Sequence, residues 1–223
     1  MENTNSSNMS PLAQCIEERQ RWHNPYITAE AFKHSMLLYC QNIMAQRGVI
    51  REFVIDENNR KILNNMYLYV IGSSSCSWDL NKGLYLGGKV GAGKTLLMQA
   101  FCKILGEISG YSIEMIPARM LSQRIMDWGI EHYMKRPIFV DELGRENLQE
   151  NYYGRIIRPF EELVSYRYEY GSRLFITSNF KPERLAQGYD NNGVKIGYGQ
   201  YIYDRLLEMC NFDILPGDSR RQL

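Results

Sequence analysis

The sequence contains no long apolar run and no signal for export. No stretch approaches the ~18 consecutive apolar residues that a membrane-spanning helix needs. The amino-terminal residues, MENTNSSNMSPL, lack the basic region and apolar region of a secretion signal. We therefore expect a cytoplasmic protein with no membrane segment.

Cysteine and histidine are too scattered to indicate cross-linking or a zinc centre. The five cysteines are an odd number without a CxxC pair, and the three histidines do not cluster. Neither a disulfide framework nor a zinc site is indicated, so we expect reduced thiols that are mostly buried. The net charge of +1 excludes a uniformly basic surface for nucleic acid but allows a local basic patch.

The composition is that of an ordinary folded protein. Of the 223 residues, 44% are hydrophobic and 23% are charged, which argues against a disordered chain. This length accommodates one α/β domain and a small appendage. We expect a mobile tail rich in Asn and Ser at residues 1–11, a helical amino-terminal segment at 12–75 and the main domain at 76–223.

Apolar periodicity predicts the elements of both parts. In the amino-terminal segment it indicates helices at about 12–21, 28–46 and 58–71, with Thr28 as an N-cap. In the main domain the strand candidates are 83–86, 112–116, 138–140, 174–177 and 212–215, and the helix candidates are 94–109, 118–134, 155–168 and 201–210. This alternation predicts a three-layer αβα domain with a five-stranded parallel sheet.

One segment has the chemistry of phosphate binding. The residues GGKVGAGKTLL at 87–97 have the Walker A spacing between an apolar strand and a helix. The glycines allow backbone N–H groups to surround phosphates, Lys94 reaches the β- and γ-phosphate oxygens, and the Thr95 hydroxyl binds magnesium. We therefore expect ATP and Mg2+ as ligands, held by Gly88, Lys89, Val90, Gly91, Ala92, Gly93, Lys94, Thr95 and Leu96. A glycine-rich turn that matches by chance is the alternative, and the flanking strand and helix argue against it.

The segment PIFVDELGRE is an apolar strand that ends in two acids. In a P-loop enzyme, Asp141 would hold magnesium and Glu142 would polarise the attacking water, as a Walker B element does. Two acids after a strand are also common in solvated loops, but the P-loop upstream favours the catalytic interpretation. The pair further favours hydrolysis over a nucleotide switch or a small-molecule kinase.

The segment RLFITSNF is an apolar strand that ends in Asn179. The Asn179 amide could orient the lytic water beside the γ-phosphate, or it could simply form a turn after the strand. The order of P-loop, acid pair and strand ending in Asn resembles that of AAA+ ATPases, in which this Asn is called sensor 1. The resemblance implies a P-loop NTPase fold of the AAA+ (ASCE) class, with Lys94, Glu142 and Asn179 as catalytic residues.

The carboxyl-terminal sequence YIYDRLLEMCNFDILPGDSRR resembles that of the DnaC, DnaI and IstB group of AAA+ proteins, and the resemblance covers residues 80–223. It implies that Arg205 is an arginine finger, which reaches the nucleotide of a neighbouring subunit and can raise turnover ~10³-fold or more. Without the resemblance, Arg205 would be interpreted as a surface arginine that pairs with Asp204 or Glu208 along its helix.

Too few residues follow Asn179 for the helical lid domain of most AAA+ proteins, and a truncated lid is typical of the DnaC and IstB group. The sensor 2 arginine of the lid would then be absent, or its role would be taken by Arg220 or Arg221.

The resemblance also implies partners. They are other copies of the chain with ATP at the subunit interfaces, single-stranded DNA, and a replicative hexameric helicase that docks on the amino-terminal segment. The favoured function is therefore loading or remodelling of a replicative DNA helicase. An IstB-like ATPase that assists a DNA transposase has nearly the same motifs and stays open. A P-loop small-molecule kinase would need an arginine-rich lid, which is not visible, and a non-hydrolysing interaction module would leave the acid pair unused.

Residues 151–173 interleave aromatic and basic side chains that could stack on bases and contact phosphates. They are Tyr152, Arg155, Arg158, Tyr166, Arg167 and Tyr168. The alternative, which we favour for most of them, is a helix that packs on the sheet and leaves its charges in solvent. Its apolar face would consist of Ile156, Ile157, Phe160, Leu163 and Val164.

Overall fold

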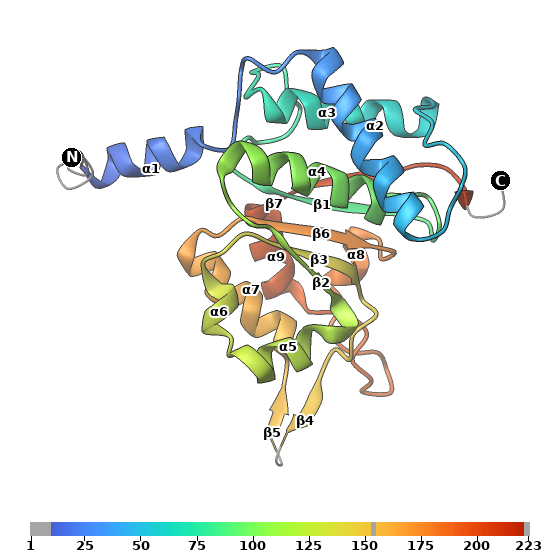
Figure 1. Ribbon diagram of the computed structural model, residues 1–223. Helices are drawn as coiled ribbons and strands as arrows, with labels where there is room; N and C mark the ends of the chain where they lie inside the picture. Colours follow the sequence, from blue (N-terminus) through green and yellow to red (C-terminus); the bar gives the residue numbers. More distant parts are fainter. Residues whose placement is uncertain (1–9, 153–154, 221–223) are drawn as a thin grey trace.

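The computed structural model describes residues 10–152 and 155–220, which form three layers with helices on both faces of a central sheet (Figure 1). All strands of this sheet are parallel, and their order is β2-β3-β6-β1-β7. The strands are β1 (Gly83–Gly88), β2 (Glu114–Pro117), β3 (Ile138–Leu143), β6 (Leu174–Ser178) and β7 (Cys210–Leu215). The predicted αβα architecture with five parallel strands is confirmed.

The strand order places the three predicted motifs at one edge of the sheet. β6 lies between β1 and β3, so that the residue after β6 lies between the P-loop and the acid pair. Because the carboxyl ends of parallel strands meet at the same edge, loops that follow these strands become neighbours. This edge is where the chemistry-bearing residues should converge.

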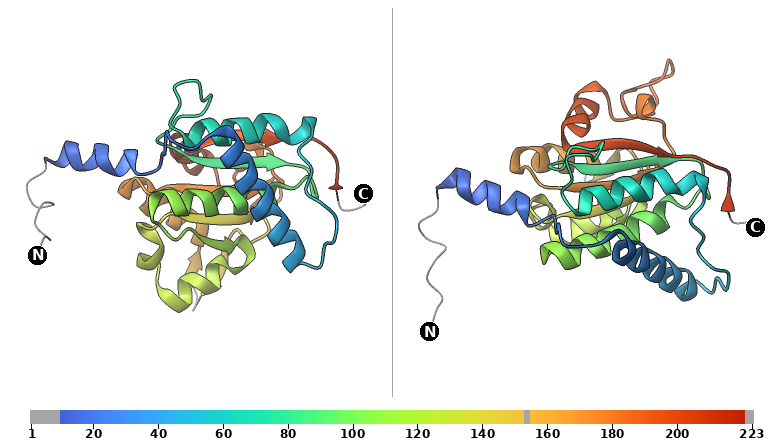
Figure 2. Two further views of the ribbon diagram at one scale, coloured as in Figure 1. Left: turned by 45° about the horizontal axis from the view of Figure 1, so that its top comes forward. Right: turned by 90° about the horizontal axis from the view of Figure 1, so that it is seen from above.

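One face of the sheet is covered by α4 (Lys94–Ser109), and α2 (Ala29–Gln46) and α3 (Glu57–Val70) pack around it (Figure 2). We call this the α4 face. Thr28 caps α2 as predicted, because its side chain accepts a hydrogen bond from the Ala31 N–H. One hydrophobic cluster joins the amino-terminal helices to the sheet, and it includes Met36, Ile62, Met66, Phe101 and Phe175. Helix α1 (Pro11–Gln20) extends away from this body.

The other face, which we call the α7 face, is covered by shorter elements. They are η1 (Ala118–Met120), α5 (Leu121–Trp128), α6 (Glu131–Met134), α7 (Pro159–Tyr170) and α9 (Gln200–Met209), and α8 (Pro182–Leu185) lies nearby. A second hydrophobic cluster fills the space beneath them, and it includes Tyr85, Val140, Leu163, Ile176 and Leu206.

Two predicted helices on the α7 face are wrong in part. The helix expected at 118–134 is broken into η1, α5 and α6, because Gly129 has a positive φ of 77° and ends α5 with a bond from its N–H to the Ile125 carbonyl. The helix expected at 155–168 begins only at Pro159, since a residue before proline avoids helical dihedrals. β5 (Arg155–Ile157) pairs instead with β4 (Glu150–Tyr152) as an antiparallel hairpin, so Ile156 and Ile157 are strand residues and not part of the helix face.

The ends of the chain differ from the sequence expectations in detail. Of the expected mobile tail, residues 1–9 lie outside the described residues, and Pro11 is the first residue of α1. Cys210, expected to end a helix, begins β7. Among the described residues after Asn179, the helices and strands are α8, α9 and β7, and they do not form a helical lid domain. Among the described helices, none is long and apolar enough to cross a membrane.

Candidate nucleotide-binding site

The glycine-rich loop between β1 and α4 is held in a conformation that only glycine adopts easily. Gly91 has a φ of 84°, and a Cβ atom there would lie 2.2 Å from Ser219 Oγ. Gly88 has a φ of 144°, and a Cβ atom there would lie 2.5 Å from the Leu215 carbonyl oxygen. The loop therefore leads into the amino terminus of α4 with its backbone close to the carboxyl-terminal segment. A helix N-terminus reached by such a loop is suited to bind phosphate.

Lys94 connects the P-loop to β6. Its side chain is buried, and Nζ lies 2.8 Å from each of three acceptors: the carbonyl oxygens of Gly88 and Lys89 and the side-chain oxygen of Asn179. An ammonium group has three protons to donate, so these three contacts match its capacity. The structure thus brings Lys94 and Asn179 together, as the strand order requires.

Asp141 connects β3 to the start of α4. Its Oδ1 atom accepts hydrogen bonds from Thr95 Oγ1 at 2.8 Å and from Thr177 Oγ1 at 2.5 Å. Hydroxyl and carboxylate oxygens are the ligand type that Mg2+ prefers, usually with one or two carboxylates, water and substrate phosphate. Among the described residues, no group of three or more His, Cys, Asp or Glu side chains could hold a metal ion. The pair Thr95 and Asp141 therefore fits a magnesium ion that is shared with a bound phosphate, and does not fit an all-protein metal cage.

Glu142 lies next to Asp141 in an unusual backbone conformation. Its φ is 58°, the one positive value of a residue other than glycine in the described chain. Its N–H donates to Thr177 Oγ1 at 3.0 Å, and its carboxylate lies 3.3 Å from Arg145 with about a third of the side chain exposed. Non-glycine residues at positive φ are often found at functional sites. The carboxylate of Glu142 is accessible, whereas Asp141 is buried.

The site residues Lys94, Thr95, Asp141, Glu142 and Asn179 line one cavity of about 1060 Å³. Its wall includes the loop from Val90 to Leu97 with Asp141, Glu142 and Asn179, and the volume suffices for a nucleotide. The other wall is the connection between α2 and α3, from Val49 to Val54, with Asp56 and Asn59 from the start of α3. Our sequence analysis missed this second wall. The only sequence signal for it was the apolar alternation of VIREFVI between two predicted helices.

Arg220 joins the carboxyl-terminal segment to the same cavity. Its backbone N–H donates to the Gly91 carbonyl at 3.0 Å, and its guanidinium lies 2.8 Å from the Asp56 carboxylate. Partial burial acts in the opposite direction, but the hydrogen bond and charge of Arg220 hold the pKa of Asp56 below its ordinary value. Of the two arginines considered for sensor 2, Arg220 is therefore at the cavity, and Arg221 lies outside the described residues.

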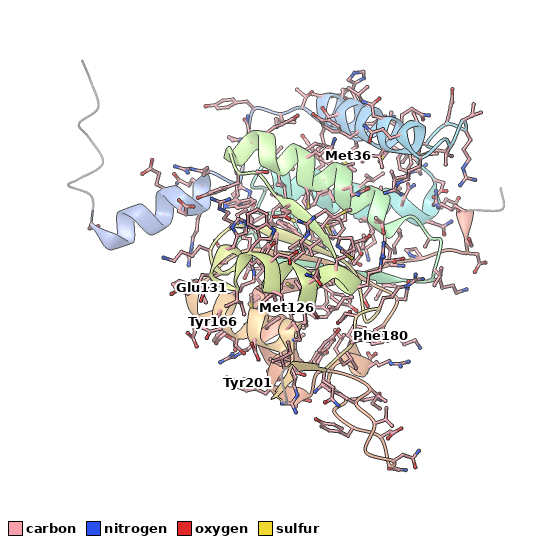
Figure 3. The ribbon with its side chains drawn as sticks, turned by 60° about the horizontal axis from the view of Figure 1, so that its bottom comes forward. Met36, Met126, Glu131, Tyr166, Phe180 and Tyr201 are labelled. Atoms are coloured by element: carbon pink, nitrogen blue, oxygen red, sulfur yellow. The ribbon has the colours of Figure 1, made fainter. Side chains whose placement is uncertain are left out.

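Arg205 is not part of this cavity. It projects from α9, and its guanidinium stacks on two rings, 4.9 Å from the centroid of Tyr168 and 4.2 Å from that of Tyr201. The two acids considered as its ion-pair partners have other partners in the structure: Asp204 accepts from Gln200, and Glu208 accepts from the Tyr168 hydroxyl. Arg205 Nη1 is buried and has no hydrogen-bond partner among the described residues. Figure 3 shows Tyr201 and Tyr166 on the side of the molecule away from Met36 of α2.

The interleaved aromatic and basic residues divide into separate groups. Arg167 is fully buried and donates to the backbone carbonyls of Tyr133, Arg136 and Arg173, so it cannot contact a phosphate of DNA. Tyr166 and Tyr168 are exposed on α7, and Arg158 donates to the Tyr189 hydroxyl. Phe160, Leu163 and Val164 are buried against the sheet as predicted. The side chains of Tyr152, Arg155 and Ile156 lie outside those that the structure describes.

Comparison with known proteins identifies the fold. No protein-family profile matches the sequence, and no curated protein sequence matches it. Among solved structures, DnaI has a TM-score of 0.57 at 19% identity, covering 92% of this chain and 100% of that one. The DnaC helicase loader has a TM-score of 0.50 at 20% identity, covering 74% and 93%. The replication initiator DnaA bound to AMPPCP and single-stranded DNA has a TM-score of 0.52 at 19% identity, covering 74% and 49%. The chain therefore has the P-loop fold of AAA+ proteins.

Proposed function

We propose that this chain is a magnesium-dependent ATPase of the DnaC and DnaI type, which assembles with copies of itself and loads or remodels a replicative DNA helicase. The observation that carries the proposal is the convergence of Lys94, Asn179, Thr95 and Asp141 on one cavity from three adjacent strands. A glycine-rich turn without a ligand would not require this arrangement.

Each residue of the site has a separate role in the proposed hydrolysis. The P-loop backbone and the α4 amino terminus bind the phosphates, and Lys94 exchanges its carbonyl partners for phosphate oxygens. Thr95 and Asp141 would hold magnesium, which would supply positive charge to neutralise the phosphates. The accessible carboxylate of Glu142 orients the attacking water and accepts its proton, while Asn179 orients the γ-phosphate or the water from β6.

Self-association is proposed from the position of Arg205. Arg205 is partly exposed on α9, outside its own cavity, and its guanidinium lies beside the exposed rings of Tyr168 and Tyr201, so it is suited to contact an acceptor on another molecule. The γ-phosphate in the cavity of a second copy is such an acceptor, and an arginine supplied in this way can contribute ~10³-fold to turnover. The nucleotide would then lie between two subunits.

The proposed partners follow from the structures that the chain resembles. One of them is described as a helicase loader, and another is a replication initiator bound to AMPPCP and single-stranded DNA. This favours a replicative helicase and single-stranded DNA over a transposase as the partners of the present chain. It also favours ATP as the nucleotide.

The proposal is tested by measuring ATP turnover at a series of protein concentrations, with and without single-stranded DNA. We expect turnover per molecule to rise with concentration, Glu142→Gln to lower it roughly 100-fold or more while ATP still binds, and Arg205→Ala to lower it by a comparable factor. Arg60→Ala, an exposed arginine of α3, is the control. Turnover that does not depend on concentration and is unaffected by Arg205→Ala would contradict assembly through this residue.

Helicase binding needs a separate measurement. Co-purification of the full chain with the replicative helicase of its own organism, in the presence of ATP and of ADP, should recover a complex that depends on the nucleotide. Failure to bind the helicase, combined with binding to a transposase, would favour the IstB-like alternative.

A further inference from the structure

Thr177 contacts both acids of the site, although no motif singled it out. It is the fourth residue of β6 and is completely buried. Its Oγ1 atom lies 2.5 Å from Asp141 Oδ1 and 3.0 Å from the backbone nitrogen of Glu142. One hydroxyl group therefore touches the side chain of the first acid and the main chain of the second.

The directions of these two hydrogen bonds are fixed by chemistry. The Glu142 N–H can only donate, so the Thr177 oxygen accepts from it. The single proton of the hydroxyl is then available to donate to the Asp141 carboxylate, which also accepts from Thr95. The Thr177 hydroxyl thus accepts a hydrogen bond from the main chain of Glu142 and donates one to the side chain of Asp141.

The contact occurs where the pairing of β3 with β6 is irregular. The two strands are in register from Ile138 with Leu174 to Val140 with Ile176, and the register resumes at Leu143 with Ser178. Between these points two residues of β3, Asp141 and Glu142, lie opposite the single residue Thr177. Such a β-bulge redirects side chains and is common next to active sites.

The bulge explains why a hydroxyl is required at this position. Glu142 has a φ of 58°, a conformation that costs about 1–3 kcal/mol for a residue other than glycine. The hydrogen bond from its N–H to Thr177 gives a partner to a part-buried donor that stands outside the regular pairing of β3 with β6. A valine has the same shape as threonine but can neither accept this bond nor donate to Asp141.

We propose that Thr177 is a positioning residue that sets the relative orientation of Asp141 and Glu142, and so couples magnesium binding to the placement of the attacking water. This inference rests on the proposed ATPase function. Groups that orient a metal ligand from behind usually contribute roughly 10- to 100-fold to metal affinity or activity. Thr177 does not contact the cavity itself, so its effect must pass through the two acids.

The neighbouring Ser178 provides a matched control. It is also completely buried, and its hydroxyl also joins β6 to β3, by donating to the Leu143 carbonyl at 2.7 Å and accepting from the Phe180 N–H at 2.9 Å. Neither acid is among these partners. Ser178→Ala should therefore cost stability in the way that Thr177→Val does, without changing the orientation of Asp141 and Glu142.

The test compares Thr177→Val, Thr177→Ser and Ser178→Ala in two measurements besides thermal unfolding. The first is the Mg2+ concentration that produces half of the Mg2+-dependent increase in affinity for a fluorescent ADP analogue. The second is steady-state ATP turnover. For Thr177→Val we expect the Mg2+ requirement to rise and kcat to fall, each roughly 10- to 100-fold, with little change in nucleotide affinity without Mg2+. Thr177→Ser should restore both values, and Ser178→Ala should leave both near wild type.

Several outcomes would contradict the inference. It is wrong if Thr177→Val has the Mg2+ requirement and kcat of the wild type, or if Ser178→Ala changes both as strongly. If Thr177→Val does not fold, Thr177→Ala provides the same removal of the hydroxyl with less crowding. A wild-type chain that neither binds nor hydrolyses ATP overturns the proposed function and the inference together, whereas an active wild type with an unaffected Thr177→Val overturns the inference alone.

Discussion

The two faces of the sheet bury similar hydrophobic clusters but differ in where they present polar groups. On the α4 face, the P-loop, Asp56 and Arg220 converge on a cavity that is open to solvent. On the α7 face, Arg205 is partly exposed beside two exposed tyrosines, and Arg167 is fully buried and donates to three backbone carbonyls. Under the proposed function, the cavity beside the α4 face binds the nucleotide and the α7 face carries the arginine that contacts a second copy of the chain.

This difference leads to a separation of effects. Changes on the α4 face near the cavity should impair nucleotide binding and turnover while leaving the fold intact. Changes at Arg167 on the α7 face should lower the free energy of unfolding while leaving the geometry of the cavity intact. A cavity substitution that only unfolds the protein, or an α7-face substitution that only impairs nucleotide binding, would contradict this distinction.

The largest effect is expected for Lys94→Ala on the α4 face. Removing the ammonium group eliminates a contact to phosphate that strengthens as charge develops, so kcat/KM should fall roughly 10³-fold, or about 4 kcal/mol. Steady-state turnover and direct nucleotide binding measure the loss. Lys103→Ala, an exposed lysine of the same helix, should retain activity. Equal activity of the two variants would show that the cavity does not bind the phosphates.

A smaller effect, on stability, is expected for Arg167→Ala on the α7 face. The change leaves three backbone carbonyl oxygens without their donor, two of them in buried hydrogen bonds, which should lower the free energy of unfolding by about 3 kcal/mol. Thermal unfolding measures this as a decrease in Tm of roughly 6–12 °C. The control is Arg136, whose side chain is exposed and whose backbone carbonyl accepts from Arg167. Arg136→Ala keeps that carbonyl and should change stability by less than about 0.5 kcal/mol. An unchanged Tm for Arg167→Ala would contradict the enclosed role.

Two glycines at positive φ, one at the cavity and one at the end of α7, test the same distinction between the faces. At Gly91 a Cβ would collide with Ser219 and displace the segment that carries Arg220, so Gly91→Ala should weaken ATP binding at least tenfold, or about 1.4 kcal/mol. At Gly171, which ends α7 with a φ of 61°, nothing lies within 4 Å. Gly171→Ala should cost about 1 kcal/mol of stability and leave ATP binding unchanged. Equilibrium binding and thermal unfolding of both variants distinguish the two results.

The smallest effect concerns Glu146 on the α7 face, which accepts from the Gly144 N–H at 2.7 Å and from the Tyr198 hydroxyl. Burial raises the pKa of Glu146 above its ordinary value, despite these hydrogen bonds. Its contribution to stability is therefore fully present below the ordinary glutamate pKa of about 4.3 and is lost as pH rises through the raised value.

Replacing the ionisable group tests this sign. Glu146→Gln keeps an acceptor but has no such pH dependence, so the stability of the variant relative to wild type should increase as pH rises from about 4 to neutrality. Chemical denaturation at several pH values measures the difference. A difference that stays constant or decreases over this range would show that Glu146 is ionised without penalty in the folded chain.

Sequence patterns predicted the α4 face better than the α7 face, and the reason is local. Helix α4 was predicted at its observed bounds, and α2 with its Thr28 cap was predicted because an 18-residue amphipathic run and its cap are encoded in neighbouring residues. On the α7 face, short elements separated by Gly129 and Pro159 were merged into longer helices. In both segments the helical spacing of apolar residues continues past the point where a helix ends or begins. The antiparallel pairing of β4 with β5 also leaves no signal in the spacing of apolar residues.

The sequence alone was enough to predict the parallel αβα architecture, which the structure confirms, and to nominate the residues that we propose bind phosphate and metal, because each motif lies within a few residues of a strand end. Only the tertiary structure decided which distant residues meet there. It joined Asp56 to Arg220 across the cavity, enclosed Arg167 in carbonyls and stacked Arg205 between two tyrosines. It also placed Thr177 opposite the bulge of β3. These contacts depend on strand order and register, which arise from packing of the whole chain and not from any local pattern.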